Sequence, residues 1–167
     1  MPDTLTHTVT HTAITPSNHV GQQPYAVINA TVEKYLLSDW MKDVVGFLVP
    51  LMEPVNGYKV LIYSGQNDVI LGAPLTEQFL STLQWTQRNA YQNASKQVWH
   101  APDPSTGKPG ADLAGYARTV GRFNQVVVRG AGHMVPGDQP TRALDMIQRF
   151  ISGKGFRDSV TEGKTEL

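Results

Sequence analysis

Apolar residues recur along this chain at two different spacings, and the spacing predicts which segments form helices and which form strands. Helical spacing first appears over residues 31–36 and resumes over residues 38–52. Pro50 falls near the end of this second segment, where a proline kinks or ends a helix. Asn56-Gly57 then breaks the chain, so the pattern predicts two helices before the first strand.

Continuous apolar runs predict strands that are buried on both faces, as in a parallel sheet. Residues 58–63 contain one such run, and residues 123–129 contain another. Residues 96–100 predict a shorter strand and residues 115–120 its antiparallel partner, with a loop rich in Pro, Asp, Ser and Gly over residues 102–110. The sequence therefore predicts two central strands and a short hairpin.

Two further helices are predicted, one after the first strand and one after the last. The first begins at Pro74, which suits a first helical turn, and is expected to run past Trp85 towards Tyr91. Its apolar side comprises Leu75, Phe79, Leu80 and Leu83. The last helix is expected to have Asp138 as its N-cap and to end at Gly153. Its buried stripe comprises Ala143, Met146, Ile147, Phe150 and Ile151.

Strands interleaved with helices predict the α/β class, with helices flanking an incomplete mixed sheet. Two strands buried on both faces need neighbours, and this sequence supplies only a hairpin, so we interpret the chain as part of a larger sheet. We predict a polar, poorly ordered N-terminal segment over residues 1–24. One α/β domain follows over residues 25–153, and a flexible polar tail over residues 154–167.

Composition excludes several classes of function. The 167 residues carry 14 basic and 14 acidic side chains, so neither nucleic acid nor an anionic membrane is an expected partner. Cysteine is absent, which excludes disulfides and Cys-ligated zinc. We expect no bound metal and no cofactor. No apolar run has the length of a membrane span, and no signal peptide is readable in the chain as given.

The most informative stretch is the glycine-lined loop from Arg129 to Pro140, which we call the histidine loop. It contains His133 and connects a predicted buried strand to the last predicted helix. Glycines let the backbone turn sharply and leave an imidazole uncovered by neighbouring Cβ atoms. Such a histidine can take up and release protons. A tight turn that merely contains a histidine is the alternative interpretation.

Asp68 follows the other predicted central strand, so both residues belong to loops at the carboxyl ends of strands, where functional loops of open α/β sheets lie. An aspartate can orient a histidine and stabilise its imidazolium. The order aspartate then histidine matches the last two members of the Ser…Asp…His order of α/β-hydrolases. No G-x-S-x-G elbow for a nucleophilic serine occurs, and Ser64 is interpreted as structural.

These stretches resemble the serine carboxypeptidase family. Tyr58 to Asp68 is similar to the segment that holds the family's catalytic aspartate. Gly130 to Pro136, with Asp138-Gln139-Pro140, is similar to its catalytic-histidine signature. The likeness runs from about His19 to Gly153 and is nearest to the vitellogenic-like branch. Many members carry a cysteine soon after the aspartate, which this sequence lacks, as does that branch.

The resemblance implies an α/β-hydrolase fold and the release of single residues from the C-termini of peptides. His133 would be the general base and then the acid, Asp68 its orienting partner, and Met134 a residue lining the pocket for the leaving residue. The resemblance also implies that the family's N-terminal half is missing, together with the nucleophilic serine and the oxyanion hole. The chain would therefore be the C-terminal portion of a serine-type carboxypeptidase, inactive alone, whose partner is the missing half.

Three origins fit these observations: a gene-model fragment, one chain of a processed enzyme, or a truncated non-catalytic homologue. A non-catalytic binding domain and part of an esterase or aminopeptidase of the same fold are the alternative functions. By resemblance the protein belongs to the secretory pathway, in a lysosome or vacuole or outside the cell. Asn29 and Asn93 each begin an N-glycosylation triplet, so the complete protein is a candidate glycoprotein.

Overall fold

The computed structural model of the chain describes residues 29–103, 106 and 109–157. The chain forms two compact units, Met1–Lys42 and Asp43–Leu167. Each unit is described by itself. The predicted segment 1–24 and most of the predicted tail lie outside the described residues, so these domain boundaries stay predictions.

Helix α1 (Ala30–Leu36) is the helix of the first unit among the described residues. Asn29 caps it, because the side-chain oxygen accepts hydrogen bonds from the backbone N–H groups of Thr31 (3.0 Å) and Val32 (3.3 Å). None of the helical residues is buried. The helix predicted over residues 31–36 is confirmed.

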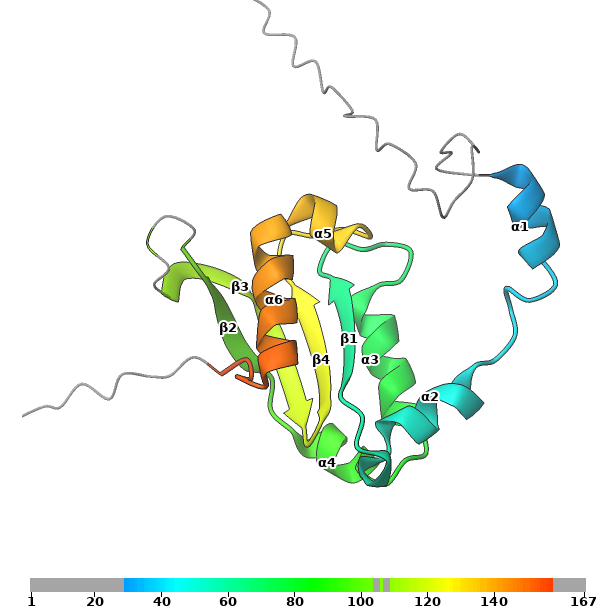
Figure 1. Cartoon of the computed structure of the whole chain (residues 1–167), viewed down its shortest axis with the longest axis horizontal. Coiled ribbons are helices and arrows are strands. Elements are labelled where there is room, and N and C mark those ends of the chain that lie inside the picture. Colours follow the sequence, from blue (N-terminus) through cyan, green and yellow to red (C-terminus); the bar gives the residue numbers. More distant parts are fainter. Residues whose placement is uncertain (1–28, 104–105, 107–108, 158–167) are drawn as a thin grey trace, which may run out of the picture. The chain divides into compact units, whose positions relative to one another are not determined.

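The second unit contains a four-stranded mixed sheet with helices on its faces (Figure 1). The sheet order is β1-β4-β3-β2, in which β1 runs parallel to β4 and the other two pairs are antiparallel. The elements in chain order are α2 (Val45–Met52), the 3-10 helix η1 (Pro54–Asn56), β1 (Val60–Gly65), α3 (Ala73–Thr82), α4 (Arg88–Asn93), β2 (Gln97–Pro102), β3 (Pro109–Val120), β4 (Phe123–Val128), α5 (Val135–Asp138) and α6 (Pro140–Ser152). The predicted hairpin is confirmed, although β3 begins six residues earlier than expected.

Apolar side chains form a separate core on each face of the sheet. On one face Val126 and Val128 of β4 pack with Trp99 and with Met146 of α6. On the other face Phe123 contacts Trp85 and Tyr91 edge-on, with ring centroids 5.3 and 5.7 Å apart. Alternation along β4 distributes these side chains between the two cores, since successive residues of a strand point to opposite faces.

The helix predicted to run from Pro74 past Trp85 is wrong in its second half. Helix α3 ends at Thr82, and α4 begins only at Arg88. Leu83 and Trp85 are both buried in the same core. Residues two positions apart lie on nearly opposite sides of a helix, so a continuous helix could not bury both. Burial of the two side chains therefore breaks the helix between them.

Helix α6 presents a different face to the core than predicted. Ala143 and Met146 are buried as expected, but Ile147 and Ile151 are exposed. In their place, Asp145 and Arg149 are buried, and together with Trp99 they form a polar cluster. Asp145 Oδ2 accepts hydrogen bonds from Trp99 Nε1 (2.7 Å) and from Arg149 Nε (2.7 Å). Arg149 Nη2 donates a further hydrogen bond to the carbonyl of His100 (3.1 Å). These bonds turn the helix towards β2.

The predicted C-terminal end of α6 is confirmed, but its predicted N-cap is wrong. Gly153 ends the helix in the left-handed conformation (φ 74°), as predicted. Asp138 as N-cap is wrong, because Gln139 occupies that position and makes no side-chain cap. The carboxylate of Asp138 instead accepts a hydrogen bond from the N–H of Gly132 at 2.7 Å.

A partly buried ion-pair network joins α3 to the β2–β3 hairpin. Glu77 of α3 lies 2.7 Å from Lys96 Nζ and 2.9 Å from Arg118 Nη2. Burial raises the pKa of Glu77, but the hydrogen bonds and charges of Lys96 and Arg118 outweigh this effect and hold the pKa below its usual value. Ionised Glu77 therefore stabilises the folded state.

We expect Glu77→Gln to lower the free energy of unfolding at pH 7 by about 1 kcal/mol, because the site is partly exposed to solvent. Below pH ~5 Glu77 binds protons more readily in the unfolded state than in the folded state, because its pKa is lowered by folding. The difference in unfolding free energy between the native protein and the variant should therefore disappear as the pH falls through the pKa of Glu77 in the folded state. Urea unfolding of both proteins from pH 7 to pH 3 measures this. Glu33→Gln in α1 serves as control, and a difference that is independent of pH would contradict the assignment.

Candidate active site

The parallel pairing of β1 with β4 brings two loops together. Gly65 is the register partner of Val128, and the carboxyl ends of parallel strands lie at the same edge of a sheet. Asp68 follows Gly65 by three residues, and His133 follows Val128 by five. Asp68 and His133, the two candidate residues from the sequence, therefore lie close together at the carboxyl edge of the sheet.

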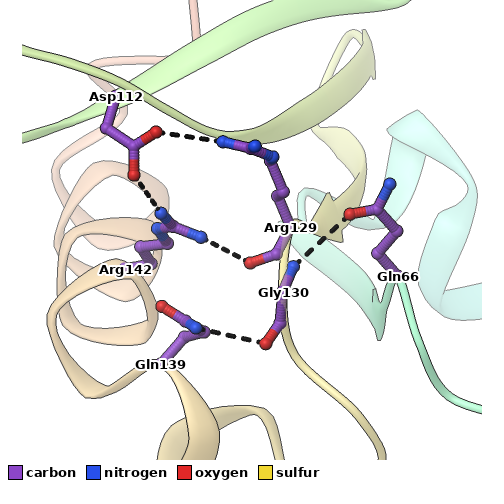
Figure 2. A network of polar contacts seen from close by, with 6 residues as sticks. All are labelled: Gln66, Asp112, Arg129, Gly130, Gln139 and Arg142. Carbon is purple, nitrogen blue, oxygen red and sulfur yellow. Dashed lines mark hydrogen bonds and ion pairs between the residues drawn. The ribbon is translucent and has the colours of Figure 1, made fainter.

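Backbone bonds tie the two loops to each other. The N–H of Asn67 donates to the carbonyl of Ala131 at 2.8 Å, and the N–H of Gln66 donates to that of Val128 at 2.9 Å. The side chain of Gln66 also reaches the N–H of Gly130 at 3.4 Å, as Figure 2 shows. Gly130 has φ 71°, a conformation that glycine adopts without steric cost. The relative position of the loops is thus set mainly by main-chain contacts.

Gly65 lies directly beneath the histidine loop. A Cβ atom at this position would stand 2.1 Å from the carbonyl oxygen of Gly132 and 2.5 Å from that of Ala131. Real Cβ atoms do not approach backbone atoms so closely. The glycine is therefore required for the close approach of the two loops.

Asp68 and His133 form the hydrogen-bonded pair at the centre of the site. His133 Nδ1 lies 3.0 Å from Asp68 Oδ2, while Oδ1 accepts from the N–H groups of Ile70 (2.8 Å) and Leu71 (3.0 Å). The Asp68 side chain is 5% exposed and that of His133 is 47% exposed. The carboxylate is thus fixed on both oxygens, and the imidazole is open to solvent.

The surroundings of Asp68 favour its ionised form. The N–H of Leu71 is the largest influence that lowers the pKa of Asp68, and burial of the carboxyl opposes it. The hydrogen bond to His133 and the N–H of Ile70 lower the pKa further, so that the net change is downward. An ionised carboxylate on Nδ1 keeps the proton on that nitrogen and leaves Nε2 able to accept one. No partner of Nε2 is present among residues 29–103, 106 and 109–157.

The histidine loop folds back on itself through Asp138. Val135 begins the short helix α5 and is almost fully buried, which anchors the loop to the core. Gly132 donates its N–H to the carboxylate of Asp138, which lies six residues further along the chain. The sequence reasoning missed both features, because α5 has only four residues and the Gly132–Asp138 contact spans six.

A polar network holds the strand end that leads into this loop (Figure 2). Gln139 donates to the carbonyl of Gly130 at 3.1 Å, and Arg142 of α6 donates to the carbonyl of Arg129. Asp112 of β3 bridges the guanidinium groups of Arg129 and Arg142. Sequence reasoning did not select Asp112 or Arg142, since no local pattern connects residues 30 positions apart.

The remaining predicted site residues lie at the surface. Met134 is adjacent to His133 and is 68% exposed. Asn29 and Asn93 are both exposed, and the Asn93 amide donates to the carbonyl of Asn89 at 2.9 Å. Ser64 is buried and lies 3.3 Å from the hydroxyl of Thr76, as a structural serine would. The functional roles assigned to Asp68, His133, Met134 and the two asparagines stay predictions.

Two absences hold for the part of the chain that the structure describes. No group of three or more His, Asp or Glu side chains gathers there in an arrangement that could hold a metal ion. Every helix there is too short or too polar to traverse a lipid bilayer.

A histidine oriented by a carboxylate at the carboxyl edge of an α/β sheet is the arrangement that two of the three triad residues have in α/β-hydrolases. Comparison with known proteins is more specific. A family model described as "Serine carboxypeptidase" matches residues 9–153, and the chain belongs to this family. The predicted family is thereby confirmed.

Similar curated proteins carry the same description. The chain is 46% identical over 138 residues to the probable serine carboxypeptidase CPVL of Homo sapiens, covering 83% of this chain and 27% of that protein. It is 42% identical over 138 residues to the venom serine carboxypeptidase of Apis mellifera, again covering 83% of this chain and 27% of that protein. The chain spans about a quarter of the length of these curated relatives.

A solved structure supports the fold. The prohormone-processing carboxypeptidase from Saccharomyces cerevisiae superposes with a TM-score of 0.63 at 20% sequence identity, covering 75% of this chain and 26% of that chain. At this identity the likeness concerns the fold alone. The four-stranded mixed sheet is an incomplete α/β-hydrolase sheet, as predicted.

We expect Gly65→Ala to separate the two loops, because the added methyl group meets the carbonyls of Ala131 and Gly132. Such overpacking costs about 1–3 kcal/mol of unfolding free energy. The Asp68–His133 hydrogen bond should also be lost, which NMR detects as disappearance of the hydrogen-bonded Nδ1–H resonance.

The matched control is Gly46→Ala in α2, where nothing lies within 4 Å of the added carbon. Alanine favours a helix over glycine by up to about 1 kcal/mol, so this variant should be no less stable than the native chain and should keep the resonance. Equal effects of the two substitutions would show that the close approach at Gly65 is unimportant.

Proposed function

We propose that this chain supplies the histidine and the aspartate of a serine-type carboxypeptidase triad, whose nucleophilic serine belongs to a region outside these 167 residues. The observation that carries the proposal is the contact of His133 Nδ1 with the Asp68 carboxylate at 3.0 Å, with Nε2 without a partner in the described part of the chain. Membership of the serine carboxypeptidase family supports it. The substrate is a peptide with a free C-terminus.

His133 would act through Nε2. It takes the proton of the serine hydroxyl as that oxygen attacks the carbonyl carbon of the last peptide bond, and then gives the proton to the departing amino group. Water repeats the cycle and releases the shortened peptide. Asp68 stays ionised throughout, holds the Nδ1–H tautomer and stabilises the imidazolium. The lowered pKa of Asp68 supports this role.

Met134 is proposed to line the pocket for the leaving residue. It directly follows His133 and is exposed beside it, which supports a place next to the departing amino group. Its flexible thioether side chain suits a pocket that accepts several apolar shapes.

The complete protein is proposed to belong to the secretory pathway, in a lysosome, a vacuole or the extracellular space. One relative is named as a venom protein, which supports export for that relative. Exposed Asn29 and Asn93 are proposed as N-glycosylation sites of the exported protein.

The 167-residue chain should hydrolyse no peptide by itself. Loss of a triad nucleophile costs on the order of a million-fold in turnover, and the oxyanion hole would be absent as well. A sensitive assay with a peptide whose C-terminal residue is released, compared with buffer, measures this. Hydrolysis by the purified chain that persists through successive purification steps would contradict the proposal.

A single-chain chimera tests the positive half of the proposal. Residues 9–153 replace the matching part of the human relative, and a fluorophosphonate probe that labels activated serines reports on the site. We expect labelling of the chimera, its abolition by His133→Ala, and a decrease on the order of 10⁴-fold for Asp68→Asn, which removes the charge and reverses the preferred tautomer. The unmodified relative is the control. Undiminished labelling of His133→Ala would disprove the role of His133.

A further inference from the structure

The imidazole of His133 is held by one hydrogen bond and little packing. Its side chain is 47% exposed, and its described partner is Oδ2 of Asp68, which lies 3.0 Å from Nδ1. A catalytic group must stay within about 0.5 Å of its productive geometry, and its rotamer is usually fixed by the side chains packed around it. Because His133 lacks such packing, the direction of Nε2 depends on how firmly the main chain holds this residue.

Asp138 binds the main chain on both sides of the histidine. Its carboxylate oxygen Oδ2 accepts the N–H of Gly132, the preceding residue, at 2.7 Å. Its own N–H donates to the carbonyl of Met134, the following residue, at 3.0 Å. Hydrogen bonds to an ionised acceptor are shorter and about twice as strong as those between neutral groups. The side chain of Asp138 thus closes a turn that spans residues 132–138 and contains His133.

The carbonyl of Gly132 is confined as well. A Cβ atom at Gly65 would stand 2.1 Å from this carbonyl oxygen, so the backbone of Gly65 lies directly against it. The carbonyl one residue earlier, that of Ala131, accepts the N–H of Asn67 at 2.8 Å. The carbonyls that lead into the histidine are therefore supported by β1 and the loop that follows it. The carboxylate of Asp138 supports the N–H.

The residue type at position 132 matches this arrangement. The φ of Gly132 lies outside the left-handed region, so the backbone conformation does not explain the glycine. A Cβ atom there would stand 3.2 Å from Asp138 Oδ2, which is closer than most real Cβ contacts. Glycine makes room for the carboxylate, but it also has more backbone freedom than any other residue. The hydrogen bond to Asp138 removes this freedom next to His133.

The carboxylate of Asp138 has no second contact in the part of the chain that the structure describes. No lysine or arginine forms an ion pair with it there. The N-cap of α6 is Gln139, so Asp138 does not serve that helix. Asp138 is exposed, and water could satisfy its charge equally well. The effect of the bond is therefore on the histidine loop.

We propose that Asp138 is a positioning residue of the triad, which holds Gly132 so that Nε2 of His133 stays directed at the nucleophilic serine. The inference rests on the proposed function. Asp138 acts only through the main chain of the histidine loop. A displacement of a reacting group by about 1 Å costs on the order of 10²-fold in rate. Loss of the carboxylate should therefore lower turnover without weakening the binding of the peptide.

Two substitutions separate the hydrogen bond from the charge. Asp138→Ala removes the acceptor, whereas Asp138→Asn keeps an oxygen that can accept the N–H of Gly132. In NMR spectra of the 167-residue chain, amide exchange at Gly132 should accelerate on the order of 10-fold or more in Asp138→Ala. The hydrogen-bonded Nδ1–H resonance of His133 should broaden in that variant, because the imidazole no longer keeps one position relative to Asp68. Both signals should return to native behaviour in Asp138→Asn.

The single-chain chimera with the human relative measures the effect on the reaction. Asp138→Ala should lower kcat for release of the C-terminal residue on the order of 10–100-fold, with KM changed less than about twofold. Asp138→Asn should restore most of kcat. A fall in kcat at native KM indicates a misdirected catalytic group, and a general loosening of the protein would not produce this pattern together with rescue by asparagine.

Asp43→Ala is the matched control. Asp43 Oδ1 accepts the N–H of Val45 at 2.7 Å, a bond of the same kind and length at the start of α2. Among the described residues no hydrogen bond joins α2 to the histidine loop. This variant should keep native kcat and the native His133 resonance. An equal loss of kcat in Asp43→Ala and Asp138→Ala would overturn the proposal.

Gly132→Ala alters the same bond from its donor side and serves if Asp138→Ala does not fold. The added methyl group would stand 3.2 Å from Asp138 Oδ2, and no other described atom outside the neighbouring residues lies within 4 Å of it. The chain should therefore stay folded while the carboxylate shifts and the bond weakens. We expect kcat to fall at native KM, by less than in Asp138→Ala. Native kcat in a folded Gly132→Ala chimera with accelerated exchange at residue 132 would contradict the positioning role.

The two kinds of measurement separate this inference from the proposed function. Native kcat in Asp138→Ala, with accelerated exchange at Gly132, would contradict the positioning role and leave the proposed function intact. The NMR changes without any hydrolysis by the unsubstituted chimera would contradict the proposed function and support the hold of Asp138 on His133. A loss of kcat that Asp138→Asn fails to restore would show that Asp138 acts through its charge, which also overturns the proposal.

Discussion

The parallel pairing of β1 with β4 is the contact on which the candidate site depends. Gly65 and its register partner Val128 are 63 residues apart in the sequence (128 − 65), yet the two strands end side by side. A slip of one residue would turn each strand's side chains to the opposite face and carry Asp68 away from His133. The absence of a side chain at Gly65 then lets the two loops cross in contact.

Helix α6 connects the stability of the sheet to the geometry of this site. Its middle is fixed to β2 through the buried Asp145, which accepts from Trp99 and Arg149. Its first turn holds the carbonyls at the end of β4 through Gln139 and Arg142. Buried polar clusters that are fully bonded specify one arrangement of the elements that they join. Packing far from His133 thereby determines where the histidine loop begins.

The sequence predicted those features that depend on short patterns. Continuous apolar runs indicated β1 and β4, although β1 lies at one end of the described sheet, and the glycine-lined loop singled out His133, because both signals are local. The break after Thr82 was missed, since burial of Leu83 and Trp85 in one core overrides helical propensity. The buried face of α6 was predicted incorrectly because the spacing of apolar residues gives no sign that a carboxylate such as Asp145 is buried. The support of Arg142 and Asp112 depends on tertiary contacts that no local pattern encodes.

The order of the strands along the chain has a consequence for folding. Strands β2, β3 and β4 follow one another directly in sequence, and α6 comes immediately after, so these elements can assemble through short loop closures. Strand β1 is separated from β4, its neighbour in the described part of the sheet, by two helices and a hairpin, and its pairing closes the longest loop between paired strands there. We therefore expect β1 to join last and to be the first strand to detach. The pair Asp68–His133 would form only at that final step.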